Sequence, residues 1–258
     1  MEALLLAGGK AERLGEASQG LPKPLVPVGG LPLAAYAVAR LVESGVTRVI
    51  VACRAGDEES FLQALAGLGA EVEAVGEVEP LGRGGGLRLA ATRRQEAGPV
   101  LALNGDELLD VDFRALLSEH EASGAAGTIV VARVRSPFGV VEVEEDGTVT
   151  GFREAPLLEH WVNSGVYVFG EDVLALLPVK GDHEQSTFPQ LAQERRLHAH
   201  RHEGVWLTVN TPKDLRRAAG SSTSRAVRSR PSKAASTCGR GRSAPSSSRE
   251  PTSSRNMT

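Results

Sequence analysis

Two glycines and two cations follow the first apolar run of the chain, and together they could hold a polyphosphate. Gly8 and Gly9 come directly after residues 3–7, which are typical of a short β-strand. Glycines there let the backbone turn sharply and approach a ligand. Arg13 and Lys23 place two cations on the same loop, and a proline on each side of Lys23 stiffens its backbone. This pattern predicts a nucleoside triphosphate site.

Two familiar phosphate-binding loops do not fit this stretch. A Walker loop requires G-x-x-x-x-G-K followed by Ser or Thr, and no lysine of the chain stands in that context. A dinucleotide-binding fingerprint requires G-x-G-x-x-G, and the spacing of Gly8, Gly9 and Gly15 differs from it. The loop is therefore predicted to hold phosphates by another arrangement.

A carboxylate follows the apolar run at residues 99–103. There the sequence reads NGD and ends at Asp106. In parallel sheets, ligands bind outside the carboxyl ends of the strands, so Asp106 is expected near the glycine turn. Mg²⁺ takes one or two carboxylates and fills its shell with phosphate oxygens and water, which suits this position. By itself NGD is also a common turn. Asp110 and Asp112 are instead expected to cap or flank a helix that begins near Phe113.

Strand-like and helix-like segments alternate along the chain. Residues 48–53 and 99–103 are short apolar runs typical of buried parallel strands. Residues 33–41 and 61–68 repeat apolar side chains at helical spacing. Residues 139–152 read as a hairpin with Asp-Gly at its turn. We therefore predict an α/β fold, a Rossmann-like mixed and mostly parallel sheet flanked by helices, with an antiparallel insertion.

The composition is that of an ordinary globular protein, with 41% hydrophobic and 24% charged residues among 258. No apolar run is long enough to cross a bilayer, and an acid at position 2 is atypical of a signal peptide. Cys53 and Cys238 are too few for a disulfide framework. We therefore expect a cytoplasmic protein with no membrane partner. The oligomeric state stays open.

The charge changes sign near residue 220. The whole chain carries −3, and a net +7 on residues 221–258 leaves −10 on residues 1–220. The end of the chain is rich in Ser and Arg and poor in large apolar residues, so it cannot offset the entropy of ordering. We expect one domain over 1–219 and a disordered basic tail over 220–258. A nucleic-acid partner is disfavoured because stacking aromatics are lacking. A frame-shifted reading of the gene is the other alternative.

The loop motifs in order resemble the sugar-1-phosphate nucleotidyltransferase family. Its signature is roughly G-G-x-G-T-R-L followed by P-K-P-L-x-P-V, and this chain has GGKAERL and PKPLVPV. Ala11 and Glu12 stand where the family has Gly-Thr. The resemblance covers residues 1–219 and implies the nucleotide-diphospho-sugar transferase fold, in which the antiparallel insertion binds the sugar.

The resemblance also implies roles for individual residues. Arg13 and Lys23 would be catalytic, with Arg13 on the β- and γ-phosphates and Lys23 on the α-phosphate. Asp106 would bind Mg²⁺. The nucleotide-binding residues would be Leu6, Ala7, Gly8, Gly9 and Gly85, the last in the sequence LGRGGG that resembles the family's L-G-T-A-G-A loop.

Three further motifs resemble sugar-binding segments. Gly139 lies in PFGV, Glu154 in FREAP and Asn163 in NSGVY, and each matches a sugar contact of the family. The family's F-x-E-K-P motif has a lysine for the acceptor phosphate, but this chain has Ala155. Either Arg153 or another cation binds that phosphate, or the acceptor differs.

Asn210 is the candidate for a second metal ligand. Many family members have an Asp in W-x-D-x-G-T, and Thr208 stands at that place. Val209-Asn210-Thr211 resembles the V-N-N segment of the branch that uses an asparagine instead. Asn210 could equally cap the helix that is predicted to begin at Pro212.

His198, His200 and His202 alternate and therefore share one face of a predicted strand. Neighbours on one face are about 7 Å apart, too far for three imidazoles to bind one zinc ion. We interpret them as a solvated or partly packed strand face.

The resemblance thus implies a Mg²⁺-dependent enzyme that joins an NTP and a sugar 1-phosphate. Its small one-domain form suggests mannose-1-phosphate guanylyltransferase-like enzymes first. One alternative is a cytidylyl- or uridylyltransferase that acts on a non-sugar or other sugar phosphate. The other is a non-catalytic sensor that binds nucleotide sugar. No motif identifies the base of the NTP or the sugar.

Overall fold

The computed structural model describes residues 1–9 and 11–221 of the 258. Apart from Gly220 and Ser221, the predicted disordered tail lies outside these residues and stays a prediction. Within the described part, no helix combines the length and the apolar character needed to cross a membrane.

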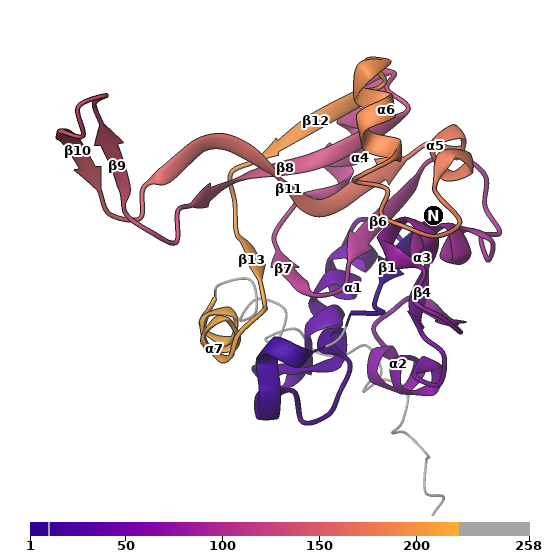
Figure 1. The fold of residues 1–258 in the computed structure, drawn as a ribbon. Helices are drawn as coiled ribbons and strands as arrows, with labels where there is room; N and C mark the ends of the chain where they lie inside the picture. The colour runs from indigo at the N-terminus through magenta and orange to yellow at the C-terminus, as the bar shows by residue number, and fades with distance from the viewer. Residues whose placement is uncertain (10, 222–258) are drawn as a thin grey trace, which may run out of the picture.

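The centre of the fold is a seven-stranded mixed sheet (Figure 1). Only β11 runs against its neighbours, β6 and β8, while the other neighbouring pairs are parallel. In spatial order the strands are β12 (Leu197–His202), β8 (Gly127–Arg135), β11 (Leu157–Phe169), β6 (Val100–Asn104), β1 (Glu2–Leu6), β4 (Arg48–Arg54) and β5 (Glu71–Glu77). The predicted fold class is confirmed.

Helices cover both faces of this sheet, and each face has its own apolar core. On one face, the core contains residues of α1 (Leu33–Glu43), α2 (Glu58–Leu65) and α4 (Phe113–Ser123). On the other face, it contains residues of α3 (Gly82–Ala91), α5 (Glu171–Leu176) and α6 (Thr187–Gln193). Strands that are covered on both faces need apolar residues on both, which explains the continuous apolar runs of β1, β4 and β6.

The remaining elements are short and lie around the sheet. Two 3₁₀ helices, η1 (Glu12–Ser18) and η2 (Lys23–Leu25), follow β1. Two-stranded pairs are formed by β2 (Pro27–Val28) with β3 (Leu31–Pro32) and by β7 (Glu107–Leu109) with β13 (Trp206–Thr208). Helix α7 (Pro212–Gly220) follows β13.

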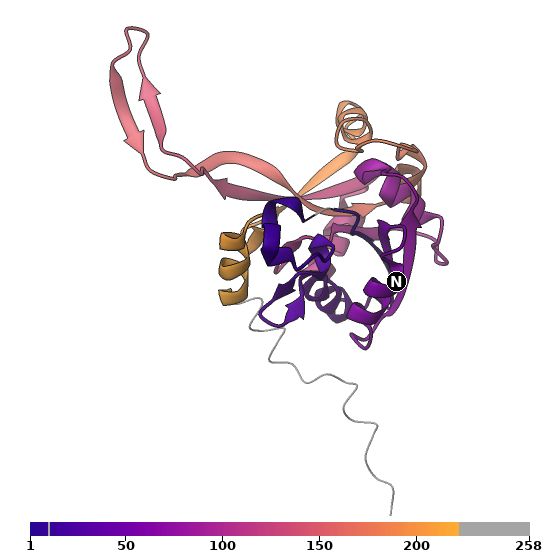
Figure 2. The ribbon, with the colours of Figure 1, turned by 60° about the horizontal axis from the view of Figure 1, so that its bottom comes forward.

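The predicted hairpin is present as β9 (Val140–Val143) and β10 (Val149–Arg153), with Gly147 at φ 88° in its turn. Figures 1 and 2 show that β8 and β11 extend beyond the body of the molecule and carry this hairpin at the end of an arm. Large apolar side chains on it are exposed, Phe152 among them at 64%.

The aspartates before α4 have separate roles. Asp112 is the N-cap of α4 and accepts hydrogen bonds from the backbone N–H groups of Arg114 and Ala115, as predicted. Asp110 instead accepts from the N–H of Val205 and lies 3.0 Å from Nε2 of His202. It therefore joins the end of β7 to the segment before β13.

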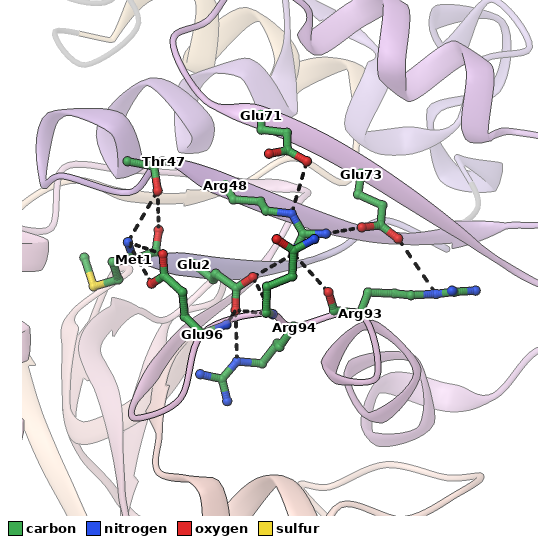
Figure 3. A network of polar contacts seen from close by, with 10 residues as sticks. Met1, Glu2, Thr47, Arg48, Glu71, Glu73, Arg93, Arg94 and Glu96 are labelled. Atoms are coloured by element: carbon green, nitrogen blue, oxygen red, sulfur yellow. Dashed lines mark hydrogen bonds and ion pairs between the residues drawn. The ribbon is translucent and has the colours of Figure 1, made fainter.

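Charged residues form a network at the amino ends of β1, β4 and β5 (Figure 3). Glu2, Arg48 and Glu71 begin these strands and are register partners. Nη1 of Arg48 donates to Glu2 at 2.6 Å, Nε donates to Glu71 at 3.3 Å, and Nη2 donates to Glu73. Nη1 also donates to the carbonyl of Arg93 at 2.9 Å. All three nitrogens of this buried guanidinium therefore have partners within the protein.

Candidate active site

The glycine turn and the NGD turn meet at the carboxyl ends of β1 and β6. These strands are parallel, and Leu6 is the register partner of Asn104. The N–H of Gly105 donates to the carbonyl of Leu6 at 2.8 Å. A Cβ at Gly105 would lie 2.8 Å from that same oxygen, so the close approach of the two turns requires glycine. The two loops predicted to act together are therefore adjacent.

Lys23 brings the predicted catalytic and metal-binding residues to one point. Its side chain is nearly buried, and Nζ donates to Oδ2 of Asp106 at 2.5 Å and to Oδ1 of Asn210 at 2.8 Å. Nη2 of Arg13 donates to the same oxygen of Asn210 at 3.0 Å. We call these four side chains the Lys23 cluster. They come from segments separated by up to 197 positions in the chain.

The Lys23 cluster contains more positive than negative charge. Two cations face one carboxylate and one neutral amide, and the Asp106 side chain is 33% exposed. A guanidinium has five N–H donors and an ammonium three, and only some of them are used here. The arrangement is therefore suited to an anion with several oxygens, such as a polyphosphate.

Asn210 can face this cluster because its neighbour caps the following helix. Thr211 is the N-cap of α7 and forms a capping box with Asp214. The cap role that the sequence left open for Asn210 is thus taken by Thr211. The amide of Asn210 donates to Oγ1 of Thr208 at 3.3 Å, which leaves its carbonyl oxygen directed to Lys23 and Arg13.

Glu107 is a buried acid that the sequence analysis missed. Burial is the main cause that raises its pKa to about 8. The hydrogen bond from Trp206 acts against this shift, and the charge of Asp106 adds to it. Its Oε2 accepts from Nε1 of Trp206 at 3.0 Å. Because Glu107 lies on β7 and Trp206 on β13, this bond joins the strand after Asp106 to the strand before Asn210.

The glycine turn borders a cavity of about 300 Å³. Its lining includes Ala7, Gly8, Gly9, Arg54 and Asp57. The predicted nucleotide-binding residues of this turn therefore face open space next to a strand end.

The glycines of α3 face different neighbours. A Cβ at Gly85 would lie 2.7 Å from the carbonyl of Val179, so that side of its backbone packs against the loop before α6. A Cβ at Gly86 would lie 2.6 Å from a carboxylate oxygen of Glu77, which also borders Gly8. Gly86, rather than Gly85, is thus the residue of this loop that shares a neighbour with the glycine turn.

The predicted sugar-binding residues divide into two places. Gly139 and Glu154 lie together at the base of the β9–β10 hairpin, where Oε2 of Glu154 is 3.1 Å from the position of a Cβ on Gly139. Asn163 lies further along β11, next to a β-bulge. Its amide donates to the hydroxyl of Tyr167 at 2.9 Å and to Glu184 at 2.8 Å. Within residues 1–9 and 11–221, no hydrogen bond or ion pair joins these three residues to the Lys23 cluster.

Two of the three alternating histidines, His198 and His200, pack against α4. Nε2 of His198 and Nδ1 of His200 lie 2.8 Å and 2.5 Å from the carboxylate oxygens of Glu119. These two hydrogen bonds lower the pKa of Glu119. His198 and His200 thus bind a helix side chain, as expected of a partly packed strand face.

Comparison with known proteins identifies the family. Residues 2–225 match the family model described as nucleotidyl transferase, which is most of the chain. The chain belongs to the nucleotidyl transferase family. The resemblance inferred from the loop motifs is thereby confirmed.

Two relatives of this nucleotidyl transferase are named for the same activity. It is 36% identical over 222 residues to the mannose-1-phosphate guanylyltransferase catalytic subunit beta of Drosophila pseudoobscura pseudoobscura, covering 83% of this chain and 60% of the relative. It is 31% identical over 226 residues to the mannose-1-phosphate guanyltransferase of Saccharomyces cerevisiae, covering 83% and 63%. The chain therefore spans about three-fifths of the length of these relatives.

A solved structure has the same fold. HddC from Yersinia pseudotuberculosis, crystallised with GMP-PN, superposes with a TM-score of 0.65 over 84% of this chain and 97% of its own. Its sequence identity to this nucleotidyl transferase is 21%, so the likeness concerns the fold.

The donor atoms of the Lys23 cluster fit Mg²⁺. A carboxylate oxygen of Asp106 and the amide oxygen of Asn210 are hard ligands, and both contact a single ammonium, so they lie near each other. Among the described residues, no group of three or more His, Cys, Asp or Glu side chains could hold a metal ion. Two protein oxygens with phosphate and water completing the shell is a usual arrangement for Mg²⁺.

Proposed function

We propose that this nucleotidyl transferase joins an NTP to a sugar 1-phosphate and releases pyrophosphate. GTP and mannose 1-phosphate are the two substrates that we expect it to prefer. The names of the relatives support the choice of base and sugar. The contact of Lys23 with both Asp106 and Asn210 is the observation that carries the reaction class, because it gathers two cations and two metal-binding oxygens at one point.

In the proposed reaction, an oxygen of the sugar 1-phosphate attacks the α-phosphorus of the NTP. A new P–O bond forms, the bond from the α-phosphorus to the bridging oxygen of the β-phosphate breaks, and pyrophosphate leaves with that electron pair. Such transfers depend on positioning and charge neutralisation rather than on covalent catalysis.

The chain's own residues have distinct parts in this step. Arg13 binds the β- and γ-phosphates, which become the leaving group. Lys23 stabilises the negative charge that develops at the α-phosphate. The backbone of Gly8 and Gly9, with Leu6, Ala7 and the α3 loop at Gly85, receives the nucleotide. Gly139, Glu154 and Asn163 bind the sugar.

Asp106 and Asn210 would hold Mg²⁺. When bound, the ion neutralises phosphate charge and orients the reacting oxygens. The ammonium of Lys23 now contacts both of these oxygens, so Lys23 must leave them to reach the α-phosphate.

A panel of substrates tests the proposal. Pyrophosphate release is measured for GTP, UTP, dTTP, CTP and ATP with the 1-phosphates of mannose, glucose and N-acetylglucosamine, at constant Mg²⁺. We expect the highest kcat/KM with GTP and mannose 1-phosphate. A higher value for another pair would overturn the choice of base or sugar. Absence of turnover with every pair, together with tight binding of a nucleotide sugar, would favour the sensor.

A second candidate keeps the transfer and changes the acceptor to a polyol or amino-alcohol phosphate, with CTP or UTP as donor. Ala155 supports it, because the usual cation for the sugar phosphate is missing at that position. Adding glycerol phosphate and phosphocholine to the panel compares the two candidates directly.

A further inference from the structure

The acceptor of the proposed reaction is a phosphate dianion, and a cation binds it through charge-assisted hydrogen bonds that are stronger than neutral ones. Position 155 holds alanine, so that cation must come from elsewhere. We propose that Arg135 binds the phosphate of the acceptor. This inference rests on the proposed function and names the residue that recognises its second substrate.

Arg135 is held against residue 155 by the pairing of β8 with β11. It is the last residue of β8 and the register partner of Leu157. The next N–H along the chain, that of Ser136, donates to the carbonyl of Pro156 at 2.9 Å. Nη1 of Arg135 donates to the carbonyl of Ala155 at 3.4 Å. The guanidinium therefore lies next to residue 155, the position at which the family motif has a lysine.

The charge of Arg135 is available for a ligand. Its side chain is exposed and, within the described part of the chain, it forms no ion pair. Arg153, the other candidate cation, instead pairs with Glu142 at 3.3 Å. Arg133 lies over the ring of Trp161, 5.3 Å from its centroid. Within the described residues, Arg135 is thus the arginine beside residue 155 that has neither an ion pair nor an aromatic partner.

The surroundings of Arg135 are those expected for an acceptor site. Two of the three predicted sugar contacts, Glu154 and Gly139, lie at the same hairpin base. Arg135 also lines a cavity of about 990 Å³, together with Trp161, Trp206 and Thr208. Oγ1 of Thr208 accepts a hydrogen bond from Asn210 of the Lys23 cluster. The cavity therefore extends from the hairpin base to a residue that touches the cluster.

The proposal is tested by Arg135→Ala in the full chain. Loss of a charge-assisted hydrogen bond predicts a KM for mannose 1-phosphate that is about 10- to 100-fold higher. The KM for GTP should stay within about twofold, because the triphosphate site does not include Arg135. Arg153→Ala removes one arginine from the same hairpin and should leave both values near wild type. Thermal unfolding of each variant checks that the fold is kept.

A second variant tests whether a cation at residue 155 can replace Arg135. Ala155 already has a left-handed φ of 42° and carries a Cβ, so lysine adds no new backbone strain there. Arg135→Ala combined with Ala155→Lys should recover most of the lost acceptor affinity. An unchanged acceptor KM in Arg135→Ala, or an equal increase in Arg153→Ala, would overturn the proposal.

Binding measurements separate this proposal from the proposed function. Mannose 1-phosphate and mannose are titrated into wild type and Arg135→Ala in the presence of a non-hydrolysable GTP analogue. We expect only the phosphorylated sugar to bind more weakly to the variant. If wild type turns over no substrate pair but shows this difference, the proposed function fails and the role of Arg135 stands. If the two proteins bind mannose 1-phosphate equally, or neither binds it, the role of Arg135 fails.

Discussion

At the amino ends of the sheet, Arg48 contacts Glu2, Glu71 and Glu73. At the carboxyl ends, Lys23 instead contacts one carboxylate and one amide, and Arg13 contacts the same amide. The first region is built by residues at the starts of strands, and its cation is saturated by protein partners. The second is built by residues of the segments that follow β1, β6 and β13, and within the described residues its cations keep unused donors. A charged group whose hydrogen-bond donors have partners within the protein contributes to stability, whereas one with unused donors can bind a ligand. The difference therefore predicts which substitutions change folding and which change activity.

The largest expected effect is on folding, from Arg48→Met. Removal of Arg48 breaks a buried 2.6 Å ion pair, and the carboxylate of Glu2 keeps Arg94 at 3.5 Å and the N–H groups of Gln95 and Glu96. Because these partners remain, the loss should lie at the lower end of the ~3–5 kcal/mol of unfolding free energy that breaking a buried pair typically costs. Urea unfolding measures the loss, and the kcat of the protein that stays folded should be unchanged. The double variant Arg48→Met/Glu2→Gln removes both charges and should be more stable than the single variant. A single variant as stable as wild type would contradict a structural role for this network.

The next effect is on catalysis, from Lys23→Ala. Loss of one preorganised charge partner at the reacting phosphate lowers kcat by ~10²–10³. The unfolding free energy should change little in comparison with Arg48→Met. Arg196→Ala is a suitable control, because it removes a cation that pairs with Asp172 and Glu194 on the surface. If Lys23→Ala keeps activity within tenfold of wild type, Lys23 has no such role.

The amino-end network also predicts a pH dependence of stability. Burial raises the pKa of Glu2, but hydrogen bonds from the N–H groups of Gln95 and Glu96 and from Arg48 outweigh it, so the folded-state pKa lies below the ordinary 4.5. A carboxyl group with a lowered pKa stabilises the fold fully above its unfolded-state value. This contribution is lost as the pH falls from about 4.5 through the lowered folded-state value. Urea unfolding of wild type and Glu2→Gln between pH 7 and 3 should show the steeper decline in wild type.

Much of the Lys23 cluster was predictable, because its residues follow strands. Asp106 lies shortly after an apolar run typical of a buried strand, and in a parallel sheet the end of that strand meets the end of β1. The position of Asp106 near the glycine turn follows from that rule, whereas its contact with Lys23, 17 positions beyond the end of β1, was not predicted. Strands β1, β4 and β6 of the sheet were predictable for the same reason, since each is a short apolar run next to helical patterns.

Other features depend on contacts that the sequence does not display. β7 and β13 have three residues each, too few for a periodic pattern, so their pairing was not predicted. The burial of Glu107 depends on that pairing, because its partner Trp206 is 99 positions away. For Asn210, a signal was present. Thr211 and Asp214 have the spacing of a capping box, which assigns the cap to Thr211 and leaves Asn210 to the cluster.

The smallest expected effects come from removing the N-cap side chains of two helices, α7 and α4. Thr211→Ala and Asp112→Ala each remove an N-cap side chain, and each should cost about 1 kcal/mol of unfolding free energy. Only Thr211 adjoins the Lys23 cluster, and its capping box fixes the backbone of Asn210 through Asp214. Thr211→Ala should therefore also lower kcat severalfold and raise the Mg²⁺ concentration that gives the half-maximal rate, whereas Asp112→Ala should change neither. Equal kcat values in the two variants would show that the position of Asn210 does not depend on the cap of α7.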